Sequence, residues 1–302
     1  MPTPPVATRP GTLITVAPTG AELDRAAWPQ LPTTLDELVA EARACEAAGA
    51  SMVHVHVRDD EHRPTLDPAR LRATVDALRE STDLVVQLST GGSVHDPLEA
   101  RLAVLDAEPD SCSLTCGTVN FGDDVFLNPW RLMVDLYRQS QERHVVPEFE
   151  LFDLGQVESL RRLLGTHGLP FGGRVHVDFV TGVPGGMPGT AQALVAGVQA
   201  LPPEVTSWSA TGIGRTHLPV LATALGMGGH LRVGMEDNLM YARDRPVASN
   251  AELVGRAAGL AREVQRPPLT TGEARTLLGV KDRRDHRDRP APLPTVQGGR
   301  RA

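Results

Sequence analysis

The chain has 302 residues with a mass of 32.3 kDa, and its 30 basic and 37 acidic side chains give a net charge of −7. This length suits one large domain or two small ones, and the mild acidity disfavours nucleic acid as a partner, because a surface that tracks phosphates needs clustered positive charge. The absence of an apolar run of about 18 residues predicts no membrane partner, and residues 1–10 lack the apolar stretch of a signal peptide.

Short apolar runs alternate with longer amphipathic segments along the chain. The runs are rich in β-forming residues and four to eight residues long, as is typical of buried parallel strands. Thr33 or Thr34 is expected to begin a helix that Gly49 ends, and Pro68, Pro97 and Pro129 each mark a first helical turn. The predicted strands cover residues 13–17, 51–57, 84–89, 111–116, 145–152, 174–180, 205–210 and 231–234.

Eight strand–helix units predict an α/β fold, a single-domain (β/α)8 TIM barrel over residues 12–280, near the usual size of about 250 residues. A doubly wound open sheet is the competing fold, and it often carries a Gly-x-Gly-x-x-Gly turn. The stretch from Gly212 to His217, Gly-Ile-Gly-Arg-Thr-His, breaks that fingerprint. Residues 1–11 form an expected N-terminal extension, residues 270–279 a short helix, and residues 281–302 a charged, Pro-rich tail predicted to be disordered.

Two residue types restrict the chemistry and the compartment. Lys281 is the only lysine and lies in the polar tail, which argues against an imine formed with a carbonyl substrate by a shielded lysine. The Gly-Lys-Ser/Thr of a Walker loop is absent as well. Three cysteines are too few for a disulfide framework, so we expect a cytoplasmic protein.

The second predicted strand ends in His54-Val-His56-Val-Arg-Asp. Side chains alternate along a strand, so His54 and His56 point to the same side and the valines to the other. Strands two and eight flank strand one in a closed barrel, and Glu236 follows strand eight. His54, His56 and Glu236 are therefore expected to form a metal site for an ion such as zinc, with an open position for catalysis.

Other polar residues follow the third, fourth and fifth strands. Ser89 and Gly91 belong to a glycine turn that permits close approach to an anion, and Thr118 and Asn120 share one face of the next loop. On strand five, Glu148 and Glu150 point inward, where each needs a cation, a polar substrate group or an arginine partner.

Two further features have less distinctive patterns. The turn from Gly212 to Arg215 follows the seventh strand, where barrel enzymes often bind phosphate, and so could serve a nucleotide-bearing cofactor. Cys112 and Cys116 share a strand face and are interpreted as small core residues.

Together these segments resemble the β-keto acid cleavage enzymes. The motifs occur in matching order across residues 12–280: ITVAPTGA, HVHVRD, STGG, GTVNFG, PEFELFD, GIGR, RVGMEDN and SNAELV. The resemblance implies a zinc-dependent TIM barrel, commonly a homotetramer, that converts a β-keto acid and acetyl-CoA into acetoacetate and a new acyl-CoA.

The resemblance also implies residue roles. It makes His54, His56 and Glu236 the zinc ligands, and Asp237 the general base, oriented by Arg232 and Ser89. Thr118 and Asn120 match the motif that holds the substrate carboxylate, although Cys116-Gly-Thr118 stands where Gly-Ser is common.

The keto acid's side chain stays open at this stage. Glu22, Glu148 and Glu150 would favour a cationic group, with Trp28 adding a cation–π face. If arginines pair with these carboxylates, the substrate is instead neutral.

Three alternatives accompany this prediction. A metal-dependent aldolase or Claisen-type lyase uses related chemistry. A mononuclear amidohydrolase also carries His-x-His at a barrel strand and would recruit His176. A non-catalytic barrel that binds small molecules predicts no metal.

Overall fold

The computed structural model describes residues 11–281 of the chain. All but one residue of both the predicted N-terminal extension and the predicted disordered tail lie outside this range.

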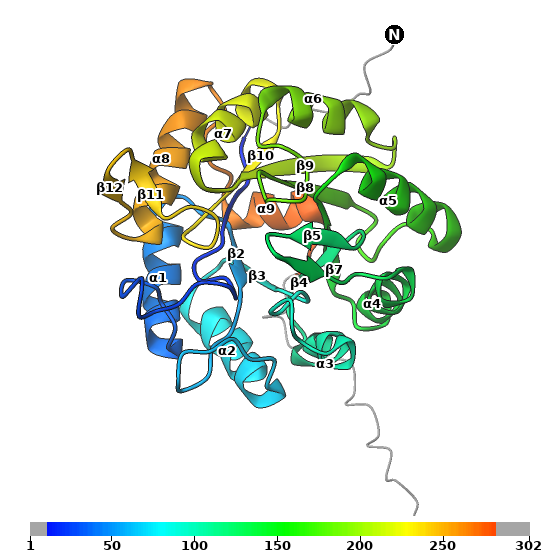
Figure 1. Cartoon of the computed structure of the whole chain (residues 1–302), viewed down its shortest axis with the longest axis horizontal. Coiled ribbons are helices and arrows are strands. Elements are labelled where there is room, and N and C mark those ends of the chain that lie inside the picture. Colours follow the sequence, from blue (N-terminus) through cyan, green and yellow to red (C-terminus); the bar gives the residue numbers. More distant parts are fainter. Residues whose placement is uncertain (1–10, 282–302) are drawn as a thin grey trace, which may run out of the picture.

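Eight parallel strands form a closed barrel in the order β1-β10-β9-β8-β7-β4-β3-β2, with helices around it (Figure 1). This confirms the predicted TIM barrel and excludes the open sheet. The barrel strands are β1 (Ile14–Val16), β2 (Met52–Val55), β3 (Val85–Leu88), β4 (Ser111–Thr115), β7 (Val146–Leu151), β8 (Val175–Thr181), β9 (Val205–Gly212) and β10 (His230–Val233).

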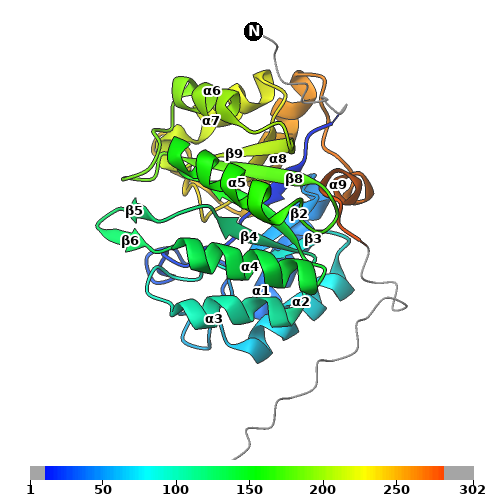
Figure 2. The ribbon, with the colours of Figure 1, turned by 90° about the vertical axis from the view of Figure 1, so that its right-hand side faces the viewer.

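Helices follow the strands and cover the barrel's outer surface, as Figure 2 shows for α3, α4 and α5. They are α1 (Leu35–Ala48), α2 (Pro68–Ser81), α3 (Leu98–Ala103) with a 3₁₀ turn (Val104–Ala107), α4 (Trp130–Glu142), α5 (Leu154–His167), α6 (Ala191–Ala200), α7 (His217–Gly226) after a 3₁₀ turn (Gly214–Thr216), α8 (Asn250–Glu263) and α9 (Thr271–Leu278). Two hairpins stand outside the barrel, formed by β5 (Val119–Phe121) with β6 (Asp124–Phe126), and by β11 (Met240–Ala242) with β12 (Arg245–Pro246).

Local sequence signals explain where several helices begin and end. Thr34 caps α1 in a reciprocal capping box with Glu37, and Gly49 ends the helix in the left-handed region at φ 118°. Pro68 occupies the first turn of α2 as predicted. Pro97 and Pro129 lie one position earlier than predicted, as the N-caps of α3 and α4.

The two faces of the barrel strands differ in character. Outward residues such as Val53 and Val55 belong to the apolar core shared with the helices. The inward residues are largely polar yet buried, which is unusual for a TIM barrel, whose interior is commonly filled by branched apolar side chains. They include His54, Gln87, Ser111, Ser113, Glu148, Glu150, His176, Asp178, Ser207, Ser209, Thr211, His230 and Arg232.

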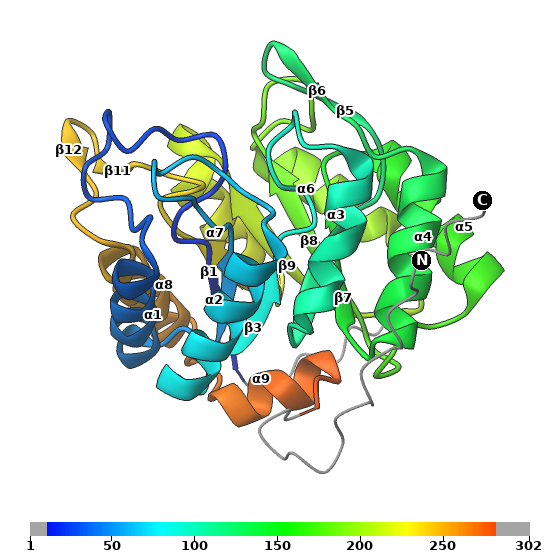
Figure 3. The ribbon, with the colours of Figure 1, turned by 90° about the horizontal axis from the view of Figure 1, so that it is seen from below.

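The two ends of the barrel also differ. Helix α9 packs across the starts of the strands, against Leu13, Met52, Val85 and Val146. Both hairpins lie at the opposite end (Figure 3). Lys281 follows α9, and its Nζ lies 5.6 Å from the centre of the Phe171 ring. The side-chain amine of the only lysine is therefore at the end of the barrel remote from the strand mouths, where it cannot form an imine with a substrate bound at the mouths.

Candidate active site and metal centre

His54, His56 and Glu236 meet at the carboxyl ends of two strands. One ligand atom from each lies within 4.8 Å of the others. Glu236 Oε1 is 3.8 Å from His54 Nε2 and 3.6 Å from His56 Nε2. Strand β1 pairs with both β2 and β10, and this brings the ends of β2 and β10 close together across it.

Gln87 sets the tautomer of His54. The two residues are register partners on β3 and β2, and His54 Nδ1 lies 2.5 Å from Gln87 Oε1. An amide oxygen can only accept a hydrogen bond, so Nδ1 carries the proton. The lone pair of Nε2 is then free and faces Glu236. Burial, with Arg232 nearby, lowers the pKa of His54 to about 3, so the ring is neutral as a metal ligand requires.

The donor set fits a divalent cation. Two imidazole nitrogens and one carboxylate are ligands that zinc commonly takes in catalytic sites. Burial raises the pKa of Glu236, but the influence of its charged surroundings, above all Arg232, outweighs it and holds the pKa well below its usual range. Glu236 Oε2 is buried without a hydrogen-bond partner among the described residues, as expected of an oxygen that coordinates an ion.

Arg232 organises the carboxylates beside this cluster. It is buried on β10 and donates to both oxygens of Asp237, from Nε at 3.1 Å and from Nη2 at 3.0 Å. Its Nη1 donates to Glu150 Oε1 at 3.1 Å, and its Nη2 also donates to Glu236 Oε1 at 2.5 Å. Burial raises the pKa of Asp237 to about 7 although Arg232 opposes this. A carboxylate with such a pKa, held in one orientation, is suited to accept a proton near neutral pH.

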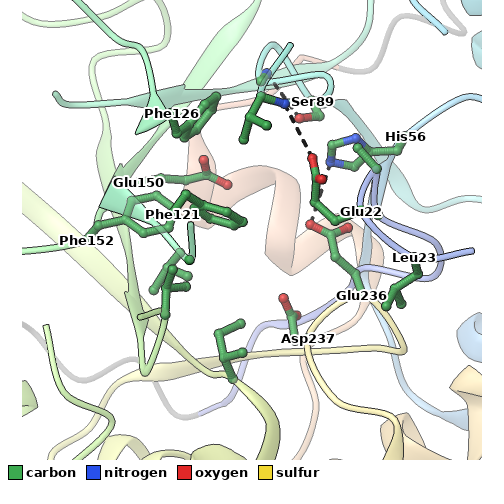
Figure 4. A pocket seen from close by; sticks show the side chains of 18 of the residues that line it. Glu22, Leu23, His56, Ser89, Phe121, Phe126, Glu150, Phe152, Glu236 and Asp237 are labelled. Carbon is green, nitrogen blue, oxygen red and sulfur yellow. Dashed lines mark hydrogen bonds and ion pairs between the residues drawn. The ribbon is translucent and has the colours of Figure 1, made fainter. Parts of the chain in front are cut away.

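These groups line a cavity of about 400 Å³. Glu22, His56, Glu236 and Asp237 lie on one side of it, and an aromatic wall of Phe121, Phe126 and Phe152 lies on the other (Figure 4). The rings of this wall contact each other edge-to-face, with centroids 6.0 to 6.4 Å apart. The cavity thus has one charged side and one apolar side, and the apolar side also includes Val94, Val180, Val183 and Ile213.

Ser89 and Gly91 line this cavity, as the glycine turn after β3 suggested. Ser89 Oγ accepts from the Gly91 N–H at 3.2 Å. Its own hydroxyl hydrogen is therefore left to donate to a bound molecule.

Three predicted substrate-binding residues do not line the cavity. Thr118 and Asn120 are exposed on the outer face of the β5–β6 hairpin, whose alternation turns Val119 and Phe121 inward instead. Thr118 Oγ1 accepts from the Asn128 N–H at 2.9 Å and so closes the base of the hairpin.

Glu148 lies deeper in the barrel than the cavity. Its Oε1 accepts from Gln87 Nε2 at 3.3 Å, and its Oε2 is 3.4 Å from His176 Nε2. His176 in turn contacts Ser207 and Ser209, so it is not available as the fourth ligand that an amidohydrolase would need.

The sequence analysis missed Gln87 and the aromatic wall. A signal for Gln87 existed, because it points inward on β3 two residues before Ser89 and at the level of His54. The wall had no comparable signal, since it joins a hairpin to the end of β7.

Within residues 11–281, no helix is both long and apolar enough to cross a membrane.

A TIM barrel with a His-His-Glu cluster and a buried arginine–aspartate pair in one cavity at its strand mouths is suited to an enzyme that polarises a carbonyl group and accepts a proton beside it. Residues 12–280 match the model of the beta-keto acid cleavage enzyme family. The chain belongs to this family and is an enzyme that cleaves β-keto acids. The predicted family and activity are confirmed, and the match decides against the hydrolase, aldolase and non-catalytic alternatives.

Named relatives agree with this assignment, and a solved structure shares the fold. The chain is 39% identical to the 3-keto-5-aminohexanoate cleavage enzyme of Acetoanaerobium sticklandii, over 89% of this chain and 98% of that protein. It is 35% identical to the 3-oxoadipate:acetyl-CoA acetyltransferase of Cupriavidus necator, over 89% and 94%. A solved binary complex of ObcA with oxaloacetate shares the fold, with a TM-score of 0.72 and 21% identity, over 84% of this chain and 68% of that one.

Proposed function

We propose that this enzyme is zinc-dependent and converts a β-keto acid and acetyl-CoA into acetoacetate and a new acyl-CoA. In this reaction the bond between the keto carbon and the adjacent methylene carbon breaks, the methylene carbon joins the acetyl group, and CoA takes the remaining acyl group. The observation that carries the proposal is that the His54–His56–Glu236 cluster and the Arg232-bound Asp237 line one cavity. Zinc held by the cluster would supply a Lewis acid for the carbonyl oxygens of the substrate.

The chain's own residues supply the proton transfer and the orientation. Asp237 is the general base that takes a proton from the carbon between carboxylate and ketone, and each of its oxygens keeps a lone pair free of Arg232. Arg232 fixes the direction of that base. The Ser89 hydroxyl and backbone N–H groups of the turn after β3 donate to substrate oxygens. Thr118 and Asn120 would act on substrate only if the β5–β6 hairpin rearranged.

We propose that the substrate's side chain is apolar along most of its length and ends in a cationic group. The aromatic wall supports the apolar part. Glu22 supports the cation, because it lines the cavity and its one hydrogen bond among the described residues is a long one from the Val94 N–H, at 3.4 Å; its charge also interacts with that of Arg58. Glu148 is remote, Glu150 is paired with Arg232, and Trp28 lines a different cavity. The relative from A. sticklandii is named for an amino keto acid, which is consistent with this choice.

A panel of β-keto acids tests the proposal. Amine-bearing, neutral apolar and carboxylate-bearing acids of equal length are offered with acetyl-CoA, and acetoacetate is followed. The amine-bearing acid is expected to give the highest kcat/KM, and Glu22→Gln to reduce that preference about tenfold without changing the neutral acid. A preference for the carboxylate-bearing acid would contradict the cationic assignment. Elemental analysis of the purified protein should return about one zinc per chain.

We further propose a cytoplasmic homotetramer. The family resemblance supports the assembly, and the three cysteines, all unpaired and buried, suit a reducing compartment. Light scattering of the purified protein tests the tetramer, and a monomer mass would contradict it.

A further inference from the structure

A second cavity, of about 700 Å³, adjoins the active site. The two cavities share Leu23, Ile213, Glu236 and Asp237. The second one is formed by the loops after β1, β9 and β10, the start of α7, the β11–β12 hairpin and part of α8. Strands β9 and β10 are the seventh and eighth of the barrel, and TIM barrels frequently bind phosphate in the loops that follow these two strands.

Positive charge distinguishes this second cavity. Arg215, Arg243 and Arg256 line it; Arg243 is exposed, with its Nε 3.9 Å from Asp244 Oδ2. No hydrogen bond or ion pair engages the Arg215 guanidinium within the described part of the chain. Arg256 donates from Nη1 to the Tyr241 carbonyl, but its Nε and Nη2 are buried without partners in that same part.

The remaining polar groups of the lining do not cancel this charge. Its two carboxylates, Glu236 and Asp237, are already paired with Arg232. His217 lines the cavity as well and is 2% exposed; burial, with Arg256 nearby, lowers its pKa to about 4, so the ring is neutral and adds no charge. Buried donors without acceptors, such as Arg256 Nε and Nη2, are uncommon in folded proteins and point to a ligand that supplies the acceptors. We name the cavity lined by Arg215, Arg243 and Arg256 the cationic cavity.

A third cavity beside the mouth also contains arginines, but they are engaged. Arg25 is bidentate to Glu37, and Arg58 donates to the carbonyls of Gly20, Leu23 and His62. Arg63 pairs with two acidic neighbours. This cavity therefore offers no free cation to an anionic ligand.

We propose that the cationic cavity binds the phosphate groups of CoA, so that the acyl thioester reaches the active site across the shared edge at Glu236 and Asp237. This inference rests on the proposed function, in which acetyl-CoA is the second substrate. Arginine guanidinium groups form charge-assisted, often bidentate hydrogen bonds with phosphate oxygens. The cavity is large enough for an extended polar ligand and is continuous with the reacting groups.

Arg215→Ala tests the assignment, with Arg131→Ala as the matched control. Arg131 lies on α4, with 93% of its side chain exposed, and lines none of the three cavities. KM is measured for acetyl-CoA and for the acetyl thioester of N-acetylcysteamine, which lacks phosphate. Arg215→Ala is expected to raise KM for acetyl-CoA about tenfold with little change in kcat, and to leave KM for the short thioester unchanged. Arg215→Lys should recover part of the loss.

Direct binding separates this inference from the proposed function. Titration of wild-type protein with CoA should show binding that weakens with salt and is about tenfold weaker in Arg215→Ala. That result would support the site even if no acetoacetate formed. Absence of CoA binding by wild-type protein, an equal KM change for both thioesters, or an unchanged KM for acetyl-CoA would overturn the assignment.

Discussion

Arg232 donates hydrogen bonds to both carboxylate oxygens of Asp237 in the interior of the barrel, from Nε at 3.1 Å and from Nη2 at 3.0 Å. This two-point contact fixes the plane of the carboxylate, so the lone pairs that remain point in defined directions. The same guanidinium also contacts Glu150 and Glu236, and therefore joins the proposed base to the metal cluster.

Asp237→Asn is expected to lower kcat by about two to four orders of magnitude, because an amide cannot take up the substrate proton. Zinc content should stay near the wild-type level, since the three ligands are unchanged. Acetoacetate formation and elemental analysis check the two halves separately. Full activity in this variant would show that another group is the base.

Gln87→Leu is expected to weaken zinc binding about 10–100-fold, because His54 then loses the acceptor that fixes its tautomer. Competition with a chromogenic chelator measures the affinity. Gln87→Glu keeps an acceptor opposite Nδ1 and should bind zinc more tightly than Gln87→Leu. His54→Ala, which removes a ligand, provides the reference for complete loss. Equal affinity in Gln87→Leu and wild type would contradict the role of Gln87.

Glu148→Gln is expected to flatten the dependence of stability on pH. Burial, together with Asp178 and Glu150, raises the pKa of Glu148 to about 8, whereas an unfolded glutamate titrates near pH ~4.3. Between these values the folded state keeps a proton that the unfolded state has lost. The free energy of unfolding should therefore fall as pH rises, by up to about 1.4 kcal/mol per pH unit.

Denaturant unfolding at about pH 5 and about pH 8 checks this expectation. The variant should lose less stability than wild type over the interval. Glu158→Gln is the control, because Glu158 lies on α5 with 75% of its side chain exposed. Identical slopes for wild type and Glu148→Gln would show that Glu148 does not hold the proton.

Gly234→Ala is expected to lower the free energy of unfolding by at least about 2 kcal/mol. Gly234 has φ +155°, and a Cβ there would lie 1.9 Å from the carbonyl oxygen of Ala17. That carbonyl also accepts from the Glu236 N–H at 3.2 Å. Displacement of the Ala17 carbonyl by the new methyl group should therefore move Glu236 and reduce zinc content. Gly255→Ala on α8 meets no heavy atom within 4 Å and should instead stabilise by about 0.5–1 kcal/mol. Denaturation curves and zinc content are measured for both variants. Equal stability of Gly234→Ala and wild type would contradict the prediction.

The strands and the His54–His56–Glu236 cluster could be predicted from the sequence, because side chains alternate along a strand with a period of two residues. All eight predicted strands occur in order, and the period of two placed His54 and His56 on one side. Glu236 followed from barrel closure, which makes β2 and β10 neighbours of β1.

Depth and loop orientation could not be predicted in the same way. Alternation shows that Glu148 and Glu150 point inward, but not that only Glu150 reaches the cavity level while Glu148 lies a layer below. Thr118 and Asn120 share a face as expected, yet the packing of Phe121 against Phe126 and Phe152 decides which face turns inward. Such packing brings together residues far apart in the sequence.

The helix α9, packed across the strand starts, has a kinetic consequence. With Leu13, Met52, Val85 and Val146 buried beneath it, this end of the barrel is closed by the residues of the 11–281 range. Both substrates must then enter, and both products leave, through the same opening at the mouth. A keto acid bound beside Glu236 and Asp237 would be covered by a CoA thioester that extends from the cationic cavity into the active site. Binding is therefore expected to follow a compulsory order, with the small acid first.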